Sequence, residues 1–182
     1  MPDYTDSELL ELFRTAENKH YAFNLLVRKY REKIYYFVRR MVVSHDDADD
    51  VVQNIFIKVW NNLDSFREDS RFFTWLYRIA VNESLSFLKN RQLRSWLSLS
   101  SPEASMVRAM QDDNYFDGTE IQKRLREAII RLPRKQKAVF NMRYYDELSY
   151  DRMSEILGTS VGALKASYHF AVKKIEQSVT GI

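Results

Sequence analysis

Cysteine is absent from the 182 residues, and glycine and proline are scarce, with four and three residues. Without cysteine the chain has no disulfide framework, no thiolate zinc site and no cysteine nucleophile. The three histidines, His20, His45 and His169, are far apart in the sequence and form no pair at metal-ligand spacing. We therefore expect no metal, no cofactor and no enzymatic site. Sheet-rich folds use glycine and proline in many turns, so their scarcity favours helices.

Two kinds of hydrophobic segment are missing as well. The acidic N-terminus lacks the apolar core of a signal peptide, and no apolar run approaches the roughly 20 residues of a transmembrane helix. We expect no membrane insertion. Hydrophobic residues nevertheless make up 45% of the chain and aromatic residues 14%. This content is enough to build cores and argues against disorder.

The formal net charge of +3 hides a strong segregation of charge along the chain. Basic residues dominate segments 28–40 and 120–182, whereas acidic residues dominate segments 41–50 and 99–119. Alternating basic and acidic blocks indicate separate surfaces for different partners.

Apolar residues recur three and four positions apart in most of the chain, which predicts an all-α fold. The pattern weakens in segment 91–119, which is rich in serine and aspartate. We therefore predict two small helical domains, 1–90 and 120–182, joined by a flexible linker, 91–119. The linker contains five apolar residues, which leave open that parts of it pack or fold on a partner: Met106, Val107, Met110, Tyr115 and Phe116. The individual helices are expected at about 47–63, from a cap at Ser70, and at 120–131, 133–145, 149–157 and 160–177.

Residues 148–169 have the pattern of a helix-turn-helix. Ser149 and Ser160 are N-cap residues for two helices, and Gly158 between them suits a positive φ at the end of the first. The outward face of the second helix carries no acid up to Ile175, so it can approach phosphates and base edges in a major groove. The alternative interpretation is an ordinary helical hairpin with a solvated basic face.

Segment 64–82 interleaves aromatic residues with arginines. Aromatic rings stack on unpaired bases and guanidinium groups hold phosphates, so the segment suits single-stranded nucleic acid. Asn82 offers an amide for bidentate contact with a base edge. The alternative is that these aromatic residues are core, because Phe72, Leu76 and Ile79 have core spacing.

The acidic stretch Asp46–Asp50 precedes an apolar helix face. Carboxylates in a first turn complement the helix dipole, so a solvated helix start is one interpretation. A docking surface for a basic partner is the other.

Together these segments resemble the extracytoplasmic-function (ECF, group 4) sigma factors of bacterial RNA polymerase, in the sigma-70 family. The resemblance covers about residues 6–176 except the linker, and it is carried by segments 47–60, 63–67, 73–82, 132–133, 148–150, 155–158 and 160–162. It implies a cytoplasmic, non-enzymatic protein without a small-molecule substrate. Such a protein binds core polymerase, directs it to promoters through the −10 and −35 elements and promotes melting. It also implies an anti-sigma factor as a partner.

The resemblance assigns three sets of residues. The docking residues, expected to contact the clamp helices of the largest polymerase subunit, are Asp49, Asp50, Gln53 and Phe56. The −10 residues are Phe66 and Arg67, in a loop that pockets a flipped base, and Tyr77, Arg78 and Asn82, on the helix that contacts the upstream part of the element. The −35 residues are Ser160, Lys165, Ala166, Ser167, His169, Phe170 and Lys173.

The chain departs from the family pattern at four positions. Ser86 stands where an aspartate is frequent, Asn54 where a glutamate is frequent, and Ser167 and Phe170 where arginines are common in the recognition helix. We therefore expect fewer phosphate contacts and a −35 preference of its own. Two rival hypotheses are a stand-alone helix-turn-helix regulator, which binds duplex DNA without polymerase, and a helical adaptor that contacts no DNA.

Overall fold

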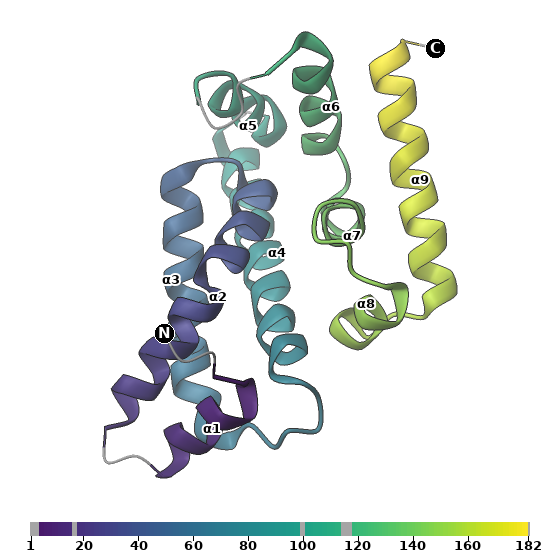
Figure 1. Cartoon of the computed structure of the whole chain (residues 1–182). Helices are drawn as coiled ribbons and strands as arrows, with labels where there is room; N and C mark the ends of the chain where they lie inside the picture. Colours follow the sequence, from purple (N-terminus) through teal and green to yellow (C-terminus); the bar gives the residue numbers. More distant parts are fainter. Residues whose placement is uncertain (1–3, 16–17, 99–100, 114–117, 182) are drawn as a thin grey trace.

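The computed structural model describes residues 4–15, 18–98, 101–113 and 118–181, without the side chains of 96–98. Within these residues all regular secondary structure is helical, as the sequence predicts (Figure 1). The helices are α1 (Asp6–Thr15), α2 (Lys19–Val42), α3 (His45–Asn62), the 3-10 turn η1 (Leu63–Ser65), α4 (Phe72–Ser98), α5 (Pro102–Gln111), α6 (Glu120–Ile130), α7 (Arg134–Tyr144), α8 (Tyr150–Leu157) and α9 (Val161–Thr180). No helix in the described residues is both long and apolar enough to cross a membrane.

Polar caps begin the two helices of the helix-turn-helix where the sequence predicts them. The hydroxyl of Ser149 accepts a hydrogen bond from the N–H of Arg152, and that of Ser160 accepts one from Ala163. The predicted cap at Ser70 is one residue too early, because α4 begins at Phe72. Proline and serine signals therefore locate helix starts only to within a residue or two.

Gly158 ends α8 in the left-handed conformation, with φ of 62°, as the sequence predicts. A Cβ there would meet no neighbouring atom within 4 Å, so Gly158→Ala introduces only backbone strain. We expect this substitution to lower the free energy of unfolding by about 1 kcal/mol.

Gly162 provides the matched control, because it lies inside α9 and also has open space around it. Gly162→Ala should raise the free energy of unfolding by about 0.5–1 kcal/mol. Urea titration of both variants checks the opposite signs, and a loss of stability in both would contradict the account.

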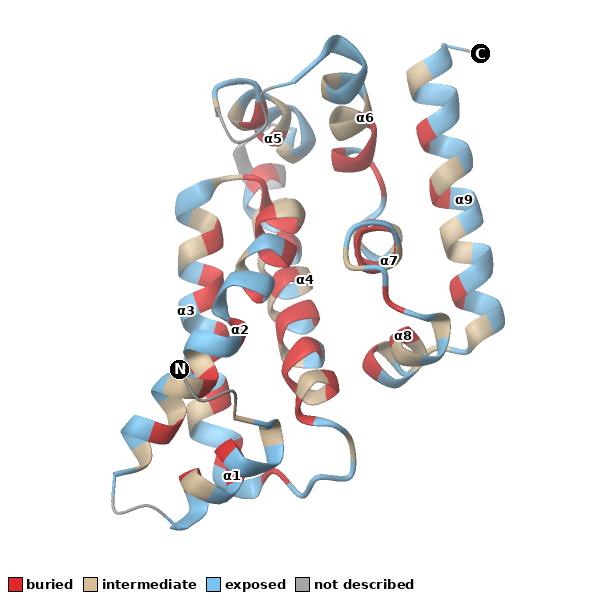
Figure 2. Cartoon of the chain, in the orientation of Figure 1, coloured by how far each residue is buried: buried red, intermediate tan, exposed pale blue. Residues whose placement is uncertain are grey.

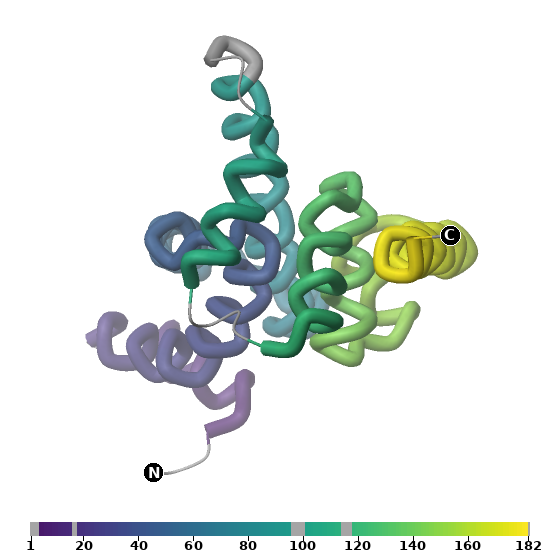
Figure 3. The backbone as a smooth tube through the Cα atoms, turned by 90° about the horizontal axis from the view of Figure 1, so that it is seen from above, coloured from purple at the N-terminus to yellow at the C-terminus, as the bar shows by residue number. Residues whose placement is uncertain are grey.

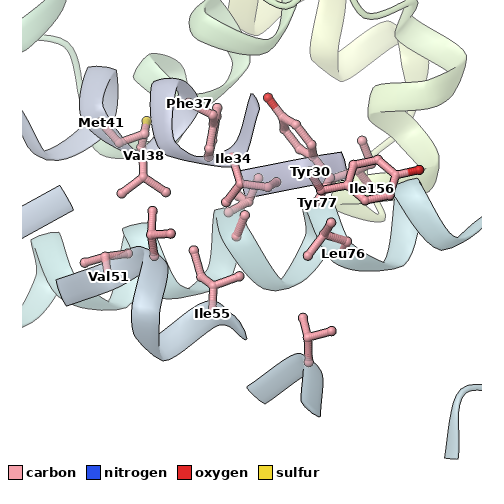
Figure 4. Packing of buried hydrophobic residues seen from close by; sticks show 14 of the residues in the cluster. Tyr30, Ile34, Phe37, Val38, Met41, Val51, Ile55, Leu76, Tyr77 and Ile156 are labelled. Atoms are coloured by element: carbon pink, nitrogen blue, oxygen red, sulfur yellow. The ribbon is translucent and has the colours of Figure 1, made fainter. Parts of the chain in front are cut away.

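The four N-terminal helices pack around one apolar core. Ile34 and Phe37 of α2, Ile55 of α3 and Leu76 of α4 all belong to this core, and each is fully buried (Figure 4). Apolar positions three or four residues apart put these side chains on one face of each helix. Figure 2 shows the buried residues concentrated where the helices meet.

The C-terminal helices have two apolar faces. One face forms a separate small core between α6, α7 and α9, made of Ala128, Ile129, Leu132, Phe140, Ala171 and Ile175. The other face, which includes Val139, Met153, Ile156 and Leu164, is continuous with the N-terminal core. Helix α4 consequently lies between the N-terminal helices and α7–α8 (Figures 1 and 3).

The described parts of segment 91–119 are largely helical. Helix α4 continues to Ser98, and α5 forms with Ser101 as its N-cap and Pro102 in its first turn. Met106 and Met110, one helical turn apart, are 3% and 2% exposed. Their burial holds α5 against the chain's own helices, whereas the sequence left open whether this segment packs or folds on a partner. Tyr115 and Phe116 lie outside the described residues.

Candidate polymerase and nucleic-acid interfaces

The four docking residues lie together in one surface groove between α2 and α3, with a volume of about 670 Å³. Their spacing of three and four residues on α3 puts them on one face of the helix. Asp50 and Gln53 are exposed, Asp49 is half-buried, and Phe56 is buried. The groove thus offers exposed carboxylate and amide groups beside an apolar floor.

Helix α2 supplies the opposite wall of this groove, which the sequence analysis did not assign. His20 stacks on Trp60 with ring centroids 4.5 Å apart, and Arg31 adds a cation to the lining of the groove. His20 and Arg31 lie on α2, distant from α3 in the sequence, and Trp60 lies near the C-terminal end of α3. Periodicity alone therefore gave no signal that they share the site.

Two of the −10 residues precede α4 in the chain. Arg67 is exposed, whereas Phe66 is 7% exposed. The ring of Phe66 lies 4.9 Å from Trp75 and 5.9 Å from Phe72, between ring centroids. Part of the aromatic excess in this segment is therefore core, and the role of Phe66 in pocketing a base remains a prediction.

Tyr77 on α4 is fully buried at the contact with the C-terminal helices. Its ring lies 4.9 Å from Phe37, and its hydroxyl donates to the carboxylate of Asp146, in the α7–α8 loop. Burial, followed by the charge of Asp146, raises the pKa of Tyr77 well above its usual value. Tyr77 is thus a neutral donor in this arrangement.

Arg78 and Asn82 lie one turn apart on the exposed side of α4. The Arg78 guanidinium donates to the carbonyl oxygens of Glu155 at 2.7 Å and Ile156 at 3.3 Å, at the C-terminal end of α8. A helix C-terminus carries partial negative charge, which suits a guanidinium.

The −35 residues follow α9 from its N-cap. Ser160 uses its hydroxyl to cap the helix, and Lys165, Ala166, His169, Phe170 and Lys173 are exposed. Phe170 is 55% exposed. The acid-free face predicted from the sequence is therefore a real solvent-facing surface.

A second groove, also of about 670 Å³, lies between α4 and the C-terminal helices. Arg78 and Asn82 line one side, and Ser167 of the −35 residues lines the other. The apolar part of the lining comes from Val81, Leu85, Val139, Leu157 and Leu164. The structure thus brings members of two predicted DNA-contacting sets to one groove, which the sequence analysis did not predict.

Asp146 links the two halves of the molecule. Its carboxylate pairs with Arg40 of α2 and accepts the Tyr77 hydroxyl. Burial raises the pKa of Asp146, while the Arg40 charge acts in the opposite direction. The Arg40 guanidinium also lies 4.9 Å from the ring centre of Tyr145. Neither Arg40 nor Asp146 belongs to a recognisable motif, so this connection is visible only in the folded chain.

Comparisons with known proteins agree with this layout. The family models for sigma-70 region 2 and sigma-70 region 4 match residues 26–94 and 122–175. The ECF RNA polymerase sigma-E factor of Escherichia coli K12 is 35% identical, over 96% of this chain and 94% of its own length. The sigma-E factor of Haemophilus influenzae is 33% identical, over 96% and 95%.

Two solved structures share the fold. CnrH, in a complex with the cytosolic domain of CnrY, superposes with a TM-score of 0.68 and 21% identity, covering 95% of this chain and 96% of CnrH. The sigma factor RpoE of Bartonella quintana, in a complex with the anti-sigma factor NepR, gives a TM-score of 0.63 and 20% identity. That match covers 87% of this chain and 96% of the other.

Proposed function

Because the chain belongs to the ECF sigma factors of the sigma-70 family, and is thus a transcription initiation factor and not an enzyme, we propose that it acts in three steps. It binds core RNA polymerase through the α2–α3 groove, recognises −10 and −35 elements and promotes melting at the −10 element. This takes place in the bacterial cytoplasm.

The observation that supports the proposal is the distribution of the three residue sets. The docking residues occupy one groove wall on α3, the helical −10 residues lie on α4, and the −35 residues follow the exposed face of α9. The three sets thus come from three different helices, which gives polymerase and each of the two DNA elements a helix of its own. A stand-alone regulator has no use for the first set, and an adaptor has no use for the other two.

Melting requires that an unpaired base be held outside the duplex. Extruding a base costs a few kcal/mol, which stacking and hydrogen bonds to its edge offset. In this proposal Arg67, which is exposed, holds phosphate beside the aromatic cluster of Phe66, Phe72 and Trp75. Asn82, also exposed, contacts a base edge. The chain thereby captures the melted strand without any covalent chemistry.

Duplex recognition is assigned to α9, whose N-terminal turns enter a major groove. Lys165 and Lys173 supply positive charge on its exposed face, while Ser167 and Phe170 supply none. With so few cations the isolated chain binds promoter DNA weakly, and most affinity comes from the assembled holoenzyme. Because two solved relatives are complexes with CnrY and with the anti-sigma factor NepR, an anti-sigma factor is also a proposed partner.

Replacing Asp50 and Gln53 together by alanine should weaken binding to core polymerase about tenfold or more in the absence of DNA. Both side chains are exposed in the docking groove, so their loss removes polar contacts and leaves the core intact. Phe56 is a poorer probe because it is 9% exposed and its truncation also destabilises the fold.

The matched control is Asp46→Ala with Asn54→Ala, which removes the same types of exposed side chain from α3 outside the groove lining. Fluorescence anisotropy of labelled chain with core polymerase measures both. Equal affinities for the two double variants would place the docking surface elsewhere.

Transcription from a set of promoter fragments, with core polymerase in the presence and absence of the chain, tests the function itself. The proposal predicts promoter-dependent transcripts only when the chain is present. Specific duplex binding without polymerase and without stimulation would instead favour the stand-alone regulator. No effect on DNA in either case would favour the adaptor.

A further inference from the structure

We propose that Arg14 of α1 is a positioning residue for the capture loop, defined as residues 66–71, which join η1 to α4. In this role Arg14 does not contact DNA itself. It holds the backbone on both sides of Arg67 in the conformation that receives the unpaired base. The inference rests on the proposed function above, because it assumes that Phe66 and Arg67 act on the −10 element.

The Arg14 guanidinium contacts two residues of the capture loop at once. Its Nη1 lies 2.6 Å from Oε1 of Glu68, and its Nη2 donates to the carbonyl oxygen of Phe66 at 3.0 Å. The planar fork of an arginine suits two such acceptors, because its N–H groups have fixed directions. The loop is therefore held just before and just after Arg67, whose side chain stays exposed.

A second ion pair holds the chain just ahead of the capture loop. The Nζ of Lys19, at the start of α2, lies 2.5 Å from a carboxylate oxygen of Asp64 in η1. The N–H of Phe66 donates to the carbonyl oxygen of Leu63 in the same turn, at 3.2 Å. Phe66 is thus fixed through its N–H by η1 and through its carbonyl oxygen by Arg14.

Helix α1 gives Arg14 a firm base. Leu9, Leu10 and Phe13 of α1 are at most 4% exposed, so the helix is anchored in the N-terminal core, whereas Arg14 is exposed. Figure 1 shows α1 at the same end of the molecule as the chain that joins α3 to α4. The function proposed above gives α1 no role, and its contact with the capture loop supplies one.

The backbone of Glu68 shows why the loop needs a brace. Its φ of 58° lies in the left-handed region, which few residues other than glycine, asparagine and aspartate adopt. Such a conformation persists only where surrounding contacts impose it, and it is frequent at functional sites. Glu68 makes its ion pair with Arg14 from this conformation. Breaking the pair therefore allows the loop to relax to a different one.

The charges of the loop favour a brace over a direct DNA contact. A carboxylate repels phosphate, so Asp64 and Glu68 are unfavourable neighbours for a strand held by Arg67. With Lys19 and Arg14 beside them, each carboxylate has a cation of the chain itself as its partner. A loop that is already in its bound conformation loses less conformational freedom when it takes up a base. The two ion pairs thus favour capture without contacting DNA.

A spin label measures the brace itself, without polymerase or DNA. Because the chain has no cysteine, Asp69→Cys introduces a single exposed labelling site in the capture loop. Continuous-wave electron paramagnetic resonance of the labelled full chain reports the mobility of the loop. We expect a shorter rotational correlation time when Arg14→Ala or Glu68→Ala is added. Arg28→Ala, at an exposed position on α2, should leave it unchanged. Equal mobility with and without the Arg14 side chain would overturn the proposal.

Base preference tests what the brace does on a promoter. For a promoter that the wild-type holoenzyme transcribes, single-base variants of the −10 element give the ratio of transcription between the preferred base and the others. Arg14→Ala should lower this ratio about fivefold at one position, that of the captured base, which corresponds to about 1 kcal/mol. An effect on folding alone would lower transcription from all templates equally. An unchanged ratio at every position would therefore refute the positioning role.

Glu68→Ala separates a brace from a direct phosphate contact by Arg14. Removing a carboxylate near DNA should by itself strengthen binding of the strand, yet the brace predicts a loss of base preference. The double variant should be no worse than Arg14→Ala alone, because both changes break one contact. Asp69→Ala, which removes the neighbouring exposed acid, should keep the wild-type ratio. Additive losses, or a wild-type ratio in Glu68→Ala, would mean that Arg14 contacts DNA itself and would overturn the proposal.

Transcription by the wild-type chain separates this inference from the function on which it rests. If the wild-type chain stimulates promoter-dependent transcription but Arg14→Ala keeps the loop order or the base preference, only this inference is wrong. If the wild-type chain does not stimulate transcription, the proposed function is wrong.

Discussion

Asn82→Ala is expected to reduce open-complex formation and transcription about 5-fold to 150-fold while leaving polymerase binding unchanged. A bidentate amide contact with a base edge contributes about 1–3 kcal/mol of discrimination. This free energy corresponds to a factor of about 5 to 150 in an equilibrium constant. Asn82 is exposed on α4, so removing its amide takes away no core contact. Permanganate reactivity of unpaired thymines measures melting, and anisotropy measures polymerase binding.

Asn90 gives the matched control, because it is another exposed asparagine, two turns further along α4. Asn90→Ala should melt and transcribe like the wild-type chain. If both asparagine variants melted promoters normally, α4 would not contact the −10 element through this amide. If Asn82→Ala lost polymerase binding instead, the roles of the two surfaces would be misassigned.

Lys137→Met is expected to stabilise the chain by about 3 kcal/mol at pH 7. Lys137 on α7 is 2% exposed, and burial lowers its pKa from 10.5 to about 8, with Glu103 acting against and Arg91 with the shift. Each unit of pKa shift corresponds to about 1.4 kcal/mol, so keeping this ammonium charged in the folded chain costs about 3 kcal/mol. Methionine has similar length and no charge to bury.

The same shift predicts a pH dependence with a definite sign. Above about pH 10.5 Lys137 is neutral in both the folded and the unfolded chain, so its burial carries no charge penalty. Between about pH 10.5 and 8 Lys137 is protonated in the unfolded chain but still neutral in the folded chain. The free energy of unfolding therefore falls as pH decreases from about 10.5 to 8. Below about pH 8 Lys137 is charged in both states, so it causes no further decrease.

Urea denaturation of wild-type and Lys137→Met chains from pH 7 to 10 gives the difference between them, in which the titrating tyrosines cancel. That difference should shrink as pH rises. Lys135→Met, at an exposed position on the same helix, should show neither the stabilisation nor the pH effect. A difference independent of pH would mean that the Lys137 charge is not costly.

Much of the fold could be predicted from local signals. Serine caps, the left-handed Gly158 and apolar spacing located α8 and α9 nearly to the residue, because each signal acts within a few positions of itself. The three residue sets came from motifs matched to a family. On α3, three- and four-residue spacing was enough to bring the docking residues to one groove.

The packing between the domains could not be predicted this way. Asp146 lies 106 residues from Arg40 and 69 from Tyr77, and no periodicity relates positions so far apart. In the sequence the buried Asp146 cannot be distinguished from the exposed acidic residues, so nothing indicated that it joins the two domains. Segment 91–119 was expected to be flexible because serine and aspartate dominate it, yet the burial of Met106 and Met110 orders α5. In this segment tertiary contacts outweighed local composition.

The most direct test of the account is transcription from a duplex library with random sequence upstream of a reporter, using core polymerase with and without the chain. Sequencing the transcribed templates identifies what the chain recognises. The account predicts chain-dependent transcripts whose templates share two sequence blocks about 25 base pairs apart, with the downstream block lost in Asn82→Ala. Transcripts that do not depend on the chain, or templates without two separated blocks, would contradict it.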